Sequence, residues 1–352
     1  MAPPYTIIDP YNLTITLLIT IAWQITGFAI AWTLQFDKIT DFTGGSNFFI
    51  LALITLTTGS TYHDRASVCI MVWAARLAGF LLFRVLKTGS DTRFDEMRSH
   101  FWQFAGFWVG QILWVWVVSL PTVILNSPAV NASNTGRVYP PFGSNALDIV
   151  GLVIFAIGFF WETLADIQKA RTASGSLSTS FKSSKPPKGQ PCTKGLWYLS
   201  RHPPYFGEII LHWGIWLLCL APTADKAISS SAQRAQWASI TAPLFTMVLL
   251  LFLSGLPPAE KPTAKKYFLM SHPPDRVAAS FTPDTLVPEN DVWANYKRYL
   301  SRTSILIPIP PPLYRPLPEW IKRTILLDLP MYRFDEEKDG RKAVEEAKRQ
   351  DA

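Results

Sequence analysis

Cysteine is scarce in this sequence, and the few cysteines follow no pattern that binds a metal or builds a disulfide framework. There are three, Cys69, Cys192 and Cys219, an odd number at wide spacing, and no CxxC occurs. The glycines do not form GxGxxG after a predicted strand, nor GxxxxGK followed by Ser or Thr, which excludes a Rossmann or P-loop nucleotide site. We therefore expect no metal, and any dinucleotide has to be held between helices.

Charged residues are also few, and apolar residues are many. Only 17% of the 352 residues are charged, whereas 49% are hydrophobic, and the chain has 14 tryptophans and a mean hydropathy of +0.16. These values are typical of a protein with several helices in lipid. The net charge of +7 does not indicate nucleic-acid binding, because no recognition motif accompanies it. The basic residues gather in loops beside apolar segments, where anionic headgroups attract them.

Seven apolar segments approach the length of a membrane span. A bilayer core about 30 Å thick requires about 20 apolar residues in a helix. We therefore predict an all-α, polytopic membrane protein with about seven transmembrane helices and a cytosolic C-terminal tail. Its parts would be an N-terminal anchor (1–40), a membrane domain (41–316) and a charged tail (317–352). The predicted spans, of which the second and sixth are short or interrupted by polar residues, are Leu13–Leu34, Phe42–Thr58, Ala66–Leu86, Phe104–Leu125, Ala146–Ala165, Tyr205–Leu220 and Ile240–Leu256.

Loop charges predict the orientation of these spans. Met1–Pro10 lacks the positive region of a cleavable signal, so the first span is expected to be a retained anchor. The loop between spans five and six contains many Lys and Arg and no acidic residue, whereas 126–145 contains only Arg137. Because positive loops stay in the cytosol, the five–six loop and the tail should be cytosolic and the N-terminus lumenal. The sequons at Asn12 and Asn131 fall on the predicted lumenal side.

The stretch GLWYLSRHPPYFGEIILHWGIW (195–216) is the most informative. Two prolines suit the first turn of a helix that begins near Tyr205, which puts Arg201 and His202 beside a helix N-terminus that can attract phosphate. These two residues could instead be headgroup anchors. Glu208 lies at the membrane surface, where a carboxylate is costly unless it has a partner or a function. The alternative is a favourable charge in the first helical turn.

Further polar residues enter the predicted spans. Glu162, Asp166 and Lys169 share one helical face at the end of span five. This face could hold ribose hydroxyls or pair with Arg201, or it could be a solvated helix end. Arg76 lies near the middle of span three, where a charge costs about 2.5–3.5 kcal/mol and should face a polar interior. It is either functional or paired with a buried carboxylate.

The region beyond Leu256 alternates proline clusters with basic and aromatic pieces. The basic-aromatic piece 293–304 (WANYKRYLSRTS) is either an interfacial anchor or a lid over a nucleotide. The last stretch, Asp335–Ala352, is expected to form a frayed helix or to stay disordered.

Five motifs together carry a resemblance to a known family. In order, they are the Trp73-Ala-Ala-Arg-Leu-Ala-Gly stretch with the later Asp91-Thr-Arg-Phe, then GLVIFAIGFFWETLADIQK (151–169), GLWYLSRHPPYFGE (195–208), SGLPPAE (254–260) and YKRYLSRTSILIP (296–308). Together they resemble a group of membrane proteins that is similar to the steroid 5-alpha-reductases and sterol reductases. The resemblance covers residues 41–316. It implies a seven-helix fold, NADPH on the cytosolic side between the last helices, and a lipid substrate that enters from the membrane.

The resemblance also implies roles for individual residues. Glu208 matches the carboxylate that contacts the nicotinamide, and Asp166 matches the acidic residue that contacts the cofactor. Other matching residues, which would serve phosphate and ribose, are Arg201, Lys169, Tyr299 and Arg302. Arg76 lies in a matching motif and is a candidate for a substrate contact, although no definite chemical role can be assigned to it. Glu162 and His202 lie beside these residues and complete the predicted cofactor site.

Two departures from the family pattern affect this interpretation. Arg-His-Pro-Asn-Tyr is replaced here by Arg-His-Pro-Pro-Tyr, so Pro204 cannot donate the hydrogen bonds of an Asn. The tail also has an insertion between Tyr267 and Asp291. The acid pair that grips a steroid ketone in this family is missing from span two, where Asn47 and His63 are the nearby candidates for a substrate contact.

The expected reaction is the NADPH-dependent reduction of a carbon–carbon double bond conjugated to a carbonyl, in a steroid or other lipid. Catalysis would involve Glu208, with Tyr205 or Tyr299 as the proton donor. We expect an endoplasmic reticulum location and an active site that faces the cytosol. Two alternatives remain open: an S-adenosylmethionine-dependent methyltransferase of the isoprenylcysteine carboxyl methyltransferase type, which resembles the same architecture, and a non-catalytic membrane scaffold.

Overall fold

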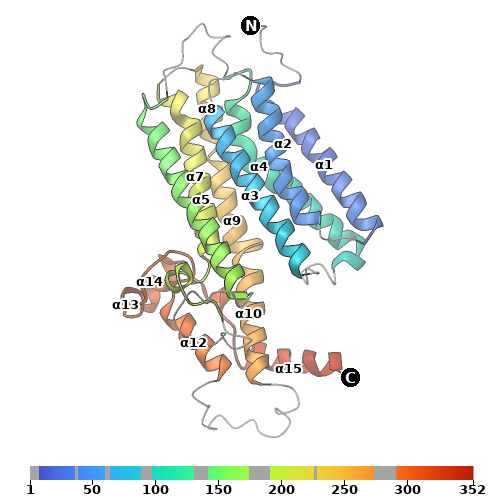
Figure 1. Cartoon of the computed structure of the whole chain (residues 1–352), viewed down its shortest axis with the longest axis vertical. Helices are drawn as coiled ribbons and strands as arrows, with labels where there is room; N and C mark the ends of the chain where they lie inside the picture. Colours follow the sequence, from blue (N-terminus) through green and yellow to red (C-terminus); the bar gives the residue numbers. More distant parts are fainter. Residues whose placement is uncertain are drawn as a thin grey trace. The chain divides into compact units, whose positions relative to one another are not determined.

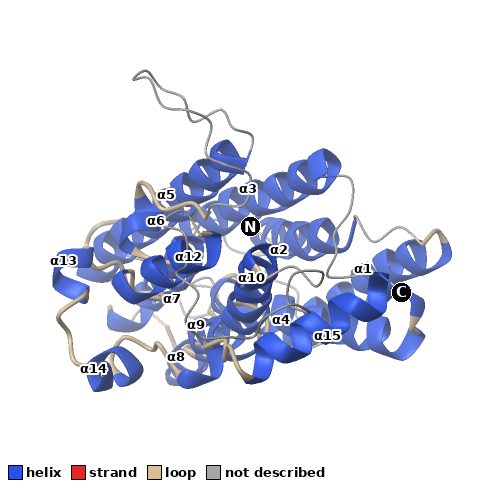
Figure 2. Ribbon diagram, turned by 90° about the horizontal axis from the view of Figure 1, so that it is seen from below, coloured by secondary structure: helices blue, strands red, loops and turns tan. Residues whose placement is uncertain are grey.

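The computed structural model describes residues 8–35, 39–59, 64–88, 97–130, 142–173, 191–225, 228–272 and 291–351. His63, the Asp91-Thr-Arg-Phe motif, the Asn131 sequon and most of the basic five–six loop lie outside these residues. Helices make up the described chain (Figures 1 and 2), and no strand occurs in it. The long helices are α1 (Leu13–Thr33), α2 (Thr40–Thr58), α3 (Asp64–Thr88), α4 (Phe101–Leu125), α5 (Ala146–Ala173), α7 (Pro203–Ala224), α10 (Leu256–Ser271), α12 (Val292–Arg302) and α15 (Lys338–Asp351).

Shorter elements connect the long helices. They are η3 (Met97–Ser99), α6 (Leu196–Leu199), α8 (Ser230–Ala238), α9 (Thr241–Val248), the π-helical turn η5 (Leu249–Leu253), α13 (Pro311–Tyr314), α14 (Glu319–Thr324) and η6 (Pro330–Tyr332).

The predicted fold class, an all-α polytopic membrane protein, is confirmed. Among the described residues, six helical stretches are long and apolar enough to cross a membrane. Six of the seven predicted spans overlap with them. The exception is the second, which forms helix α2 but is not among the six, because Gly44, Gly45 and Asn47 make it less apolar. The six stretches are Leu13–Thr33, Arg65–Phe83, Phe101–Leu125, Ala146–Thr172, Pro203–Ala224 and Ser230–Ser271.

The chain divides into two compact units. Unit 1 contains Met1–Ile157 and Ile209–Met247, and unit 2 contains Gly158–Glu208 and Val248–Ala352. The chain passes between the units within α5, within α7 and after Met247. The boundary predicted at residue 316 falls inside unit 2.

Unit 1 is a helical bundle with apolar packing and a polar interior. Helix α1 packs against α2 and α4, and α2 packs against α3 and α4. Buried amides join these helices: Gln24 Nε2 on α1 donates to Asn47 Oδ1 on α2 over 3.0 Å, and Gln111 Nε2 on α4 donates to Thr40 O over 2.9 Å. Such bonds satisfy polar groups that have no water in a bilayer interior.

Unit 2 is built around α10. This helix packs against α12 and α15 through an aromatic cluster that includes Phe268, Trp293 and Tyr296. The predicted frayed or disordered end is instead a packed helix, because Ala343 and Val344 of α15 form a buried apolar face. Asp291 caps α12 by accepting from Ala294 N over 3.1 Å.

Candidate functional site

A buried cluster of charged side chains lies at the centre of unit 2. Arg201 and His202 come directly before α7, which begins at Pro203, because the Pro203-Pro204 pair fits a first helical turn and cannot continue a helix from upstream. Glu260 lies on α10, and Asp328 follows α14. Three distant parts of the sequence therefore meet at one arginine.

The distances in this cluster are short. Arg201 Nη1 lies 2.6 Å from Glu260 Oε2, and Arg201 Nη2 lies 3.0 Å from Asp328 Oδ1. Glu260 Oε1 is 2.5 Å from His202 Nε2. The side chains of Arg201 and Glu260 are each only 6% exposed. Because water cannot replace these partners, loss of either side of the pair leaves an uncompensated buried charge.

The pKa shifts indicate how the cluster is charged. Burial acts to lower the pKa of Arg201, but the carboxylates of Glu260 and Asp328 outweigh it and raise that pKa, so the guanidinium is charged. Burial lowers the pKa of His202 by more than its hydrogen bond with Glu260 raises it. The neutral ring then donates its Nε2–H to a carboxylate, which can only accept. The contact between His202 and Glu260 is therefore a hydrogen bond between a neutral ring and an anion.

Extended backbone pairing fixes the residues around Arg201. Arg201 N donates to Ser304 O over 2.8 Å, and His202 N donates to Ile305 O over 3.1 Å. Ser200 Oγ, which is buried, donates to Leu306 O over 2.8 Å. The segment that follows α12 is thus held directly beside the start of α7.

Both predicted catalytic tyrosines have defined positions here. The half-buried Tyr205 stacks on His202, with ring centroids 5.2 Å apart and planes 1° from parallel. Tyr299 is buried, and its hydroxyl donates to Trp197 O over 2.8 Å. Burial raises the pKa of Tyr299. The catalytic roles predicted for Tyr205 and Tyr299 stay predictions.

The end of α5 adds further predicted residues to unit 2. Trp197 Nε1 donates to Ala165 O over 3.0 Å, and Lys169 Nζ lies 5.0 Å from the Trp197 ring centroid. Glu162 is buried where α5 approaches α7: a Cβ on Gly207 would lie 2.7 Å from Glu162 N, so only glycine fits there. Asp166 and Glu208 are half-buried in the same unit.

Several buried donors in unit 2 have no hydrogen-bond partner within the described chain. They include Arg302 Nε, Thr303 Oγ1 and Ser304 Oγ, three consecutive residues at the end of α12, and Trp293 Nε1 at its start. Unpaired buried donors cost free energy unless a ligand or water accepts from them. A cofactor rich in acceptor oxygens, such as a dinucleotide phosphate, fits a run of this kind.

The remaining predicted residues, Asn47 and Arg76, belong to unit 1, whereas the charged cluster belongs to unit 2. Asn47 is fully buried on α2 and accepts from Gln24. Arg76 is half-buried on α3, with its guanidinium carbon 5.6 Å from the Phe80 ring centroid. The predicted substrate contacts of both residues, and the predicted phosphate contacts of Arg201 and His202, stay predictions.

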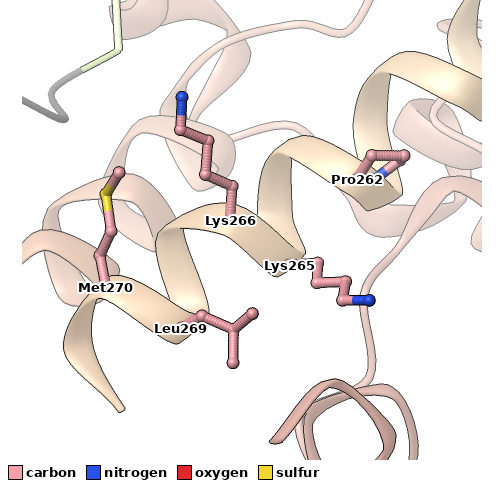
Figure 3. A pocket seen from close by; sticks show the side chains of 5 residues that line it. All are labelled: Pro262, Lys265, Lys266, Leu269 and Met270. Atoms are coloured by element: carbon pink, nitrogen blue, oxygen red, sulfur yellow. The ribbon is translucent and has the colours of Figure 1, made fainter. Parts of the chain in front are cut away.

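One open groove of about 430 Å³ lies on α10, lined by Pro262, Lys265, Lys266, Leu269 and Met270. Figure 3 shows these five side chains on a single helix, with the two lysines pointing in different directions. None of the predicted site residues lines this groove. It is therefore separate from the charged cluster.

Sequence reasoning missed the two carboxylates that bind Arg201. Glu260 ends the SGLPPAE motif, and the only available signal was a carboxylate directly after an apolar stretch. Asp328 lies between Leu327 and Leu329, an isolated charge in an apolar run. Neither position indicates its partner, because the pairs are separated by 59 and 127 residues along the chain.

Comparison with known proteins identifies a family for most of the chain. A family described as "Protein of unknown function (DUF1295)" matches residues 27–271, well over half of the 352 residues. No curated protein and no solved structure gives a match. The match includes Arg201, His202 and Glu260 but ends before α12 and Asp328. By this match, the chain belongs to the DUF1295 family.

Proposed function

We propose that this chain is an NADPH-dependent membrane oxidoreductase that reduces a carbon–carbon double bond, conjugated to a carbonyl, in a steroid or other lipid. The observation that carries the proposal is the run of buried donors at Arg302, Thr303 and Ser304. This run belongs to a motif (296–308) that resembles the steroid 5-alpha-reductases. The buried ion cluster and the backbone pairing at Arg201 hold the run against the start of α7.

Residues of unit 2 offer matching chemistry for each part of such a cofactor. Arg302 and Lys169 suit phosphate, because each is a cation. The carboxylates of Glu162 and Asp166 suit ribose hydroxyls, which donate hydrogen bonds. Glu208 is the residue that the resemblance assigns to the nicotinamide end.

The chain's own task in this reaction is to bind, to exclude water and to move one proton. NADPH, when bound, supplies a hydride for the β carbon of the enone. Tyr205 would donate a hydrogen bond or its proton to the enolate oxygen. A proton from water would then add to the α carbon while the oxygen returns any proton to Tyr205, so that the double bond gains one hydride and one proton in total. The ring of His202 stacks on Tyr205 and holds it in a fixed orientation. We further propose that this side of the protein faces the cytosol at the endoplasmic reticulum.

Thermal unfolding of the full chain in nanodiscs tests the cofactor assignment. NADPH at about 100 times its dissociation constant should stabilise the protein by about 2.7 kcal/mol, and S-adenosylmethionine should not. Arg302→Gln should reduce the NADPH effect. Arg298→Gln is the matched control, since Arg298 is an exposed arginine of the same helix that bonds only the local Asn295 Oδ1 in the described contacts.

The alternative outcomes separate the rival functions. Stabilisation by S-adenosylmethionine alone would support a methyltransferase, and no response to either compound would support a scaffold. If NADPH binds, its oxidation in the presence of enone lipids, followed by the loss of absorbance of the reduced nicotinamide, tests the reaction itself.

A further inference from the structure

Residues 310–332 form a segment with an unusually apolar surface outside the six candidate membrane spans. Leu313, Trp320, Ile325 and Met331 are between 48% and 64% exposed. These four side chains lie within 19 residues, on α13, on and just after α14, and in η6. An exposed apolar surface of this kind is costly in water unless something covers it.

These apolar side chains are exposed although the segment is held in place by contacts with buried residues. Tyr314 is buried and its hydroxyl donates to Asp328 Oδ2 over 3.1 Å. Lys322 is 8% exposed, and its ammonium lies 5.0 Å from the Tyr314 ring centroid. Leu326 is buried beside them. The inner side chains thus hold the four apolar ones outward.

A second contact joins the segment to one of the candidate membrane spans. Tyr332 is buried, and its hydroxyl donates to Leu251 O over 2.6 Å, a carbonyl of the π-helical turn η5 within the candidate span Ser230–Ser271. The next residues of that span, Phe252 and Leu253, are 43% and 62% exposed. Phe252, Leu253 and the segment all belong to unit 2, so the segment lies beside an exposed apolar part of a candidate span.

The charges of the segment favour an anionic surface. Between Pro310 and Arg333 there are four cationic side chains against two carboxylates. One carboxylate, Asp328, is buried against Arg201. The other, Glu319, is exposed and is shared among three cations: it lies 2.9 Å from Arg333 Nη2 and 3.5 Å from both Arg323 Nε and Lys322 Nζ. Arg315 and Arg323 are exposed, and basic residues beside apolar ones are typical of segments that lie in a bilayer interface.

We propose that residues 310–332 rest in the headgroup layer of a bilayer that contains anionic phospholipids. Leu313, Trp320, Ile325 and Met331 insert toward the acyl chains, while Arg315 and Arg323 contact lipid phosphates. The first part of the predicted charged tail (317–352) then binds the membrane. The same part also contains Asp328, which pairs with Arg201. This inference depends on the membrane fold and does not depend on the proposed reductase activity.

Fluorescence of an environment-sensitive label in nanodiscs tests this proposal. The full chain with Cys192→Ser, which retains only the two buried cysteines, is labelled at Trp320→Cys or Ile325→Cys. Lys348→Cys, at an exposed position of α15, is the matched control. Nitroxides attached to lipid chains should quench the labels at 320 and 325 several times more strongly than the label at 348. Iodide in the water should show the reverse order.

Two quenching results would overturn the insertion of the segment into the bilayer. The first is equal quenching by iodide at all three positions, which would put the segment in water. The second is shielding from iodide without quenching by the lipid nitroxides, which would indicate a protein partner instead. The anionic preference is tested with phosphatidylserine in place of phosphatidylcholine: nitroxide quenching at 320 should increase, and Arg315→Gln with Arg323→Gln should abolish the increase. An unchanged response would overturn the headgroup contact.

Discussion

The two units of this protein differ in the buried polar atoms that they leave without a hydrogen-bond partner. Within the described part of unit 1, these atoms include amide oxygens, which can only accept, together with donors such as Asn47 Nδ2. In unit 2, every such side-chain atom among the described residues can donate. The amide oxygens of unit 1 belong to Gln24, Gln111, Asn126 and Gln236.

This difference indicates two kinds of interior. In unit 1 the set contains both donors and acceptors, whereas every member of the set in unit 2 can donate. Acceptor oxygens of water, phosphate or ribose would satisfy the donors of unit 2. Unit 2 also contains the buried charge cluster at Arg201, whereas the buried bonds described above for unit 1, such as that from Gln24 to Asn47, join neutral groups. The proposed cofactor would therefore find its hydrogen-bond partners among the donors of unit 2, whereas buried amide bonds of unit 1 join its helices.

The largest expected effect comes from breaking the charge cluster. Glu260→Gln removes the main counter-charge of Arg201 and should lower the free energy of unfolding by about 3–5 kcal/mol, as is usual when one partner of a buried ion pair is lost. Chemical unfolding of the purified protein in detergent measures it. The control is Glu336→Gln, which removes an exposed pair with Lys297 and should change stability little. Similar losses from both variants would contradict a buried cluster.

The second effect depends on pH and arises from His202. The pKa of His202 is lowered in the folded state. At a pH below the unfolded-state pKa, which is about 6.5, the unfolded chain therefore binds more protons than the folded chain, and the free energy of unfolding decreases as the pH decreases. One such group contributes a slope of at most about 1.4 kcal/mol per pH unit. His202→Gln keeps a donor toward Glu260 and should flatten the stability profile between about pH 6.5 and 5. An identical slope in the variant would show that another group is responsible.

The smallest expected effect is in unit 1. Gln24→Met removes the hydrogen bond to Asn47 and should cost about 0.6 kcal/mol, the average for such bonds between membrane helices. The replacement also removes an unpaired amide oxygen, which reduces the cost further. The same unfolding assay measures it. A loss as large as that of Glu260→Gln would remove the contrast between the units.

Local patterns in the sequence were sufficient to predict most of the fold. Apolar length alone predicted the spans, because a bilayer forces its helices to be long and apolar. Proline chemistry predicted the start of α7 to within a few residues of Pro203. Helix α2 is less apolar than its prediction as a membrane span implied. Its glycines and Asn47 pack inside unit 1, so the helix does not need an apolar side chain at those positions.

Non-local contacts were beyond the reach of the sequence. Arg201 and His202 were predicted as site residues from their place before a helix, but Glu260 and Asp328 were not found as their partners. The end of the chain was misjudged for a similar reason. Its charges indicated disorder, yet Ala343 and Val344 provide enough apolar surface to pack α15, and that surface is visible only once α10 is in place.

The most direct test of this account is an experimental structure of the full chain with NADPH. The account predicts phosphate or ribose oxygens within hydrogen-bond distance of Arg302, Thr303 and Ser304, while the pair between Arg201 and Glu260 stays intact. Cofactor density elsewhere, or water alone at these three donors when NADPH is saturating, would contradict it.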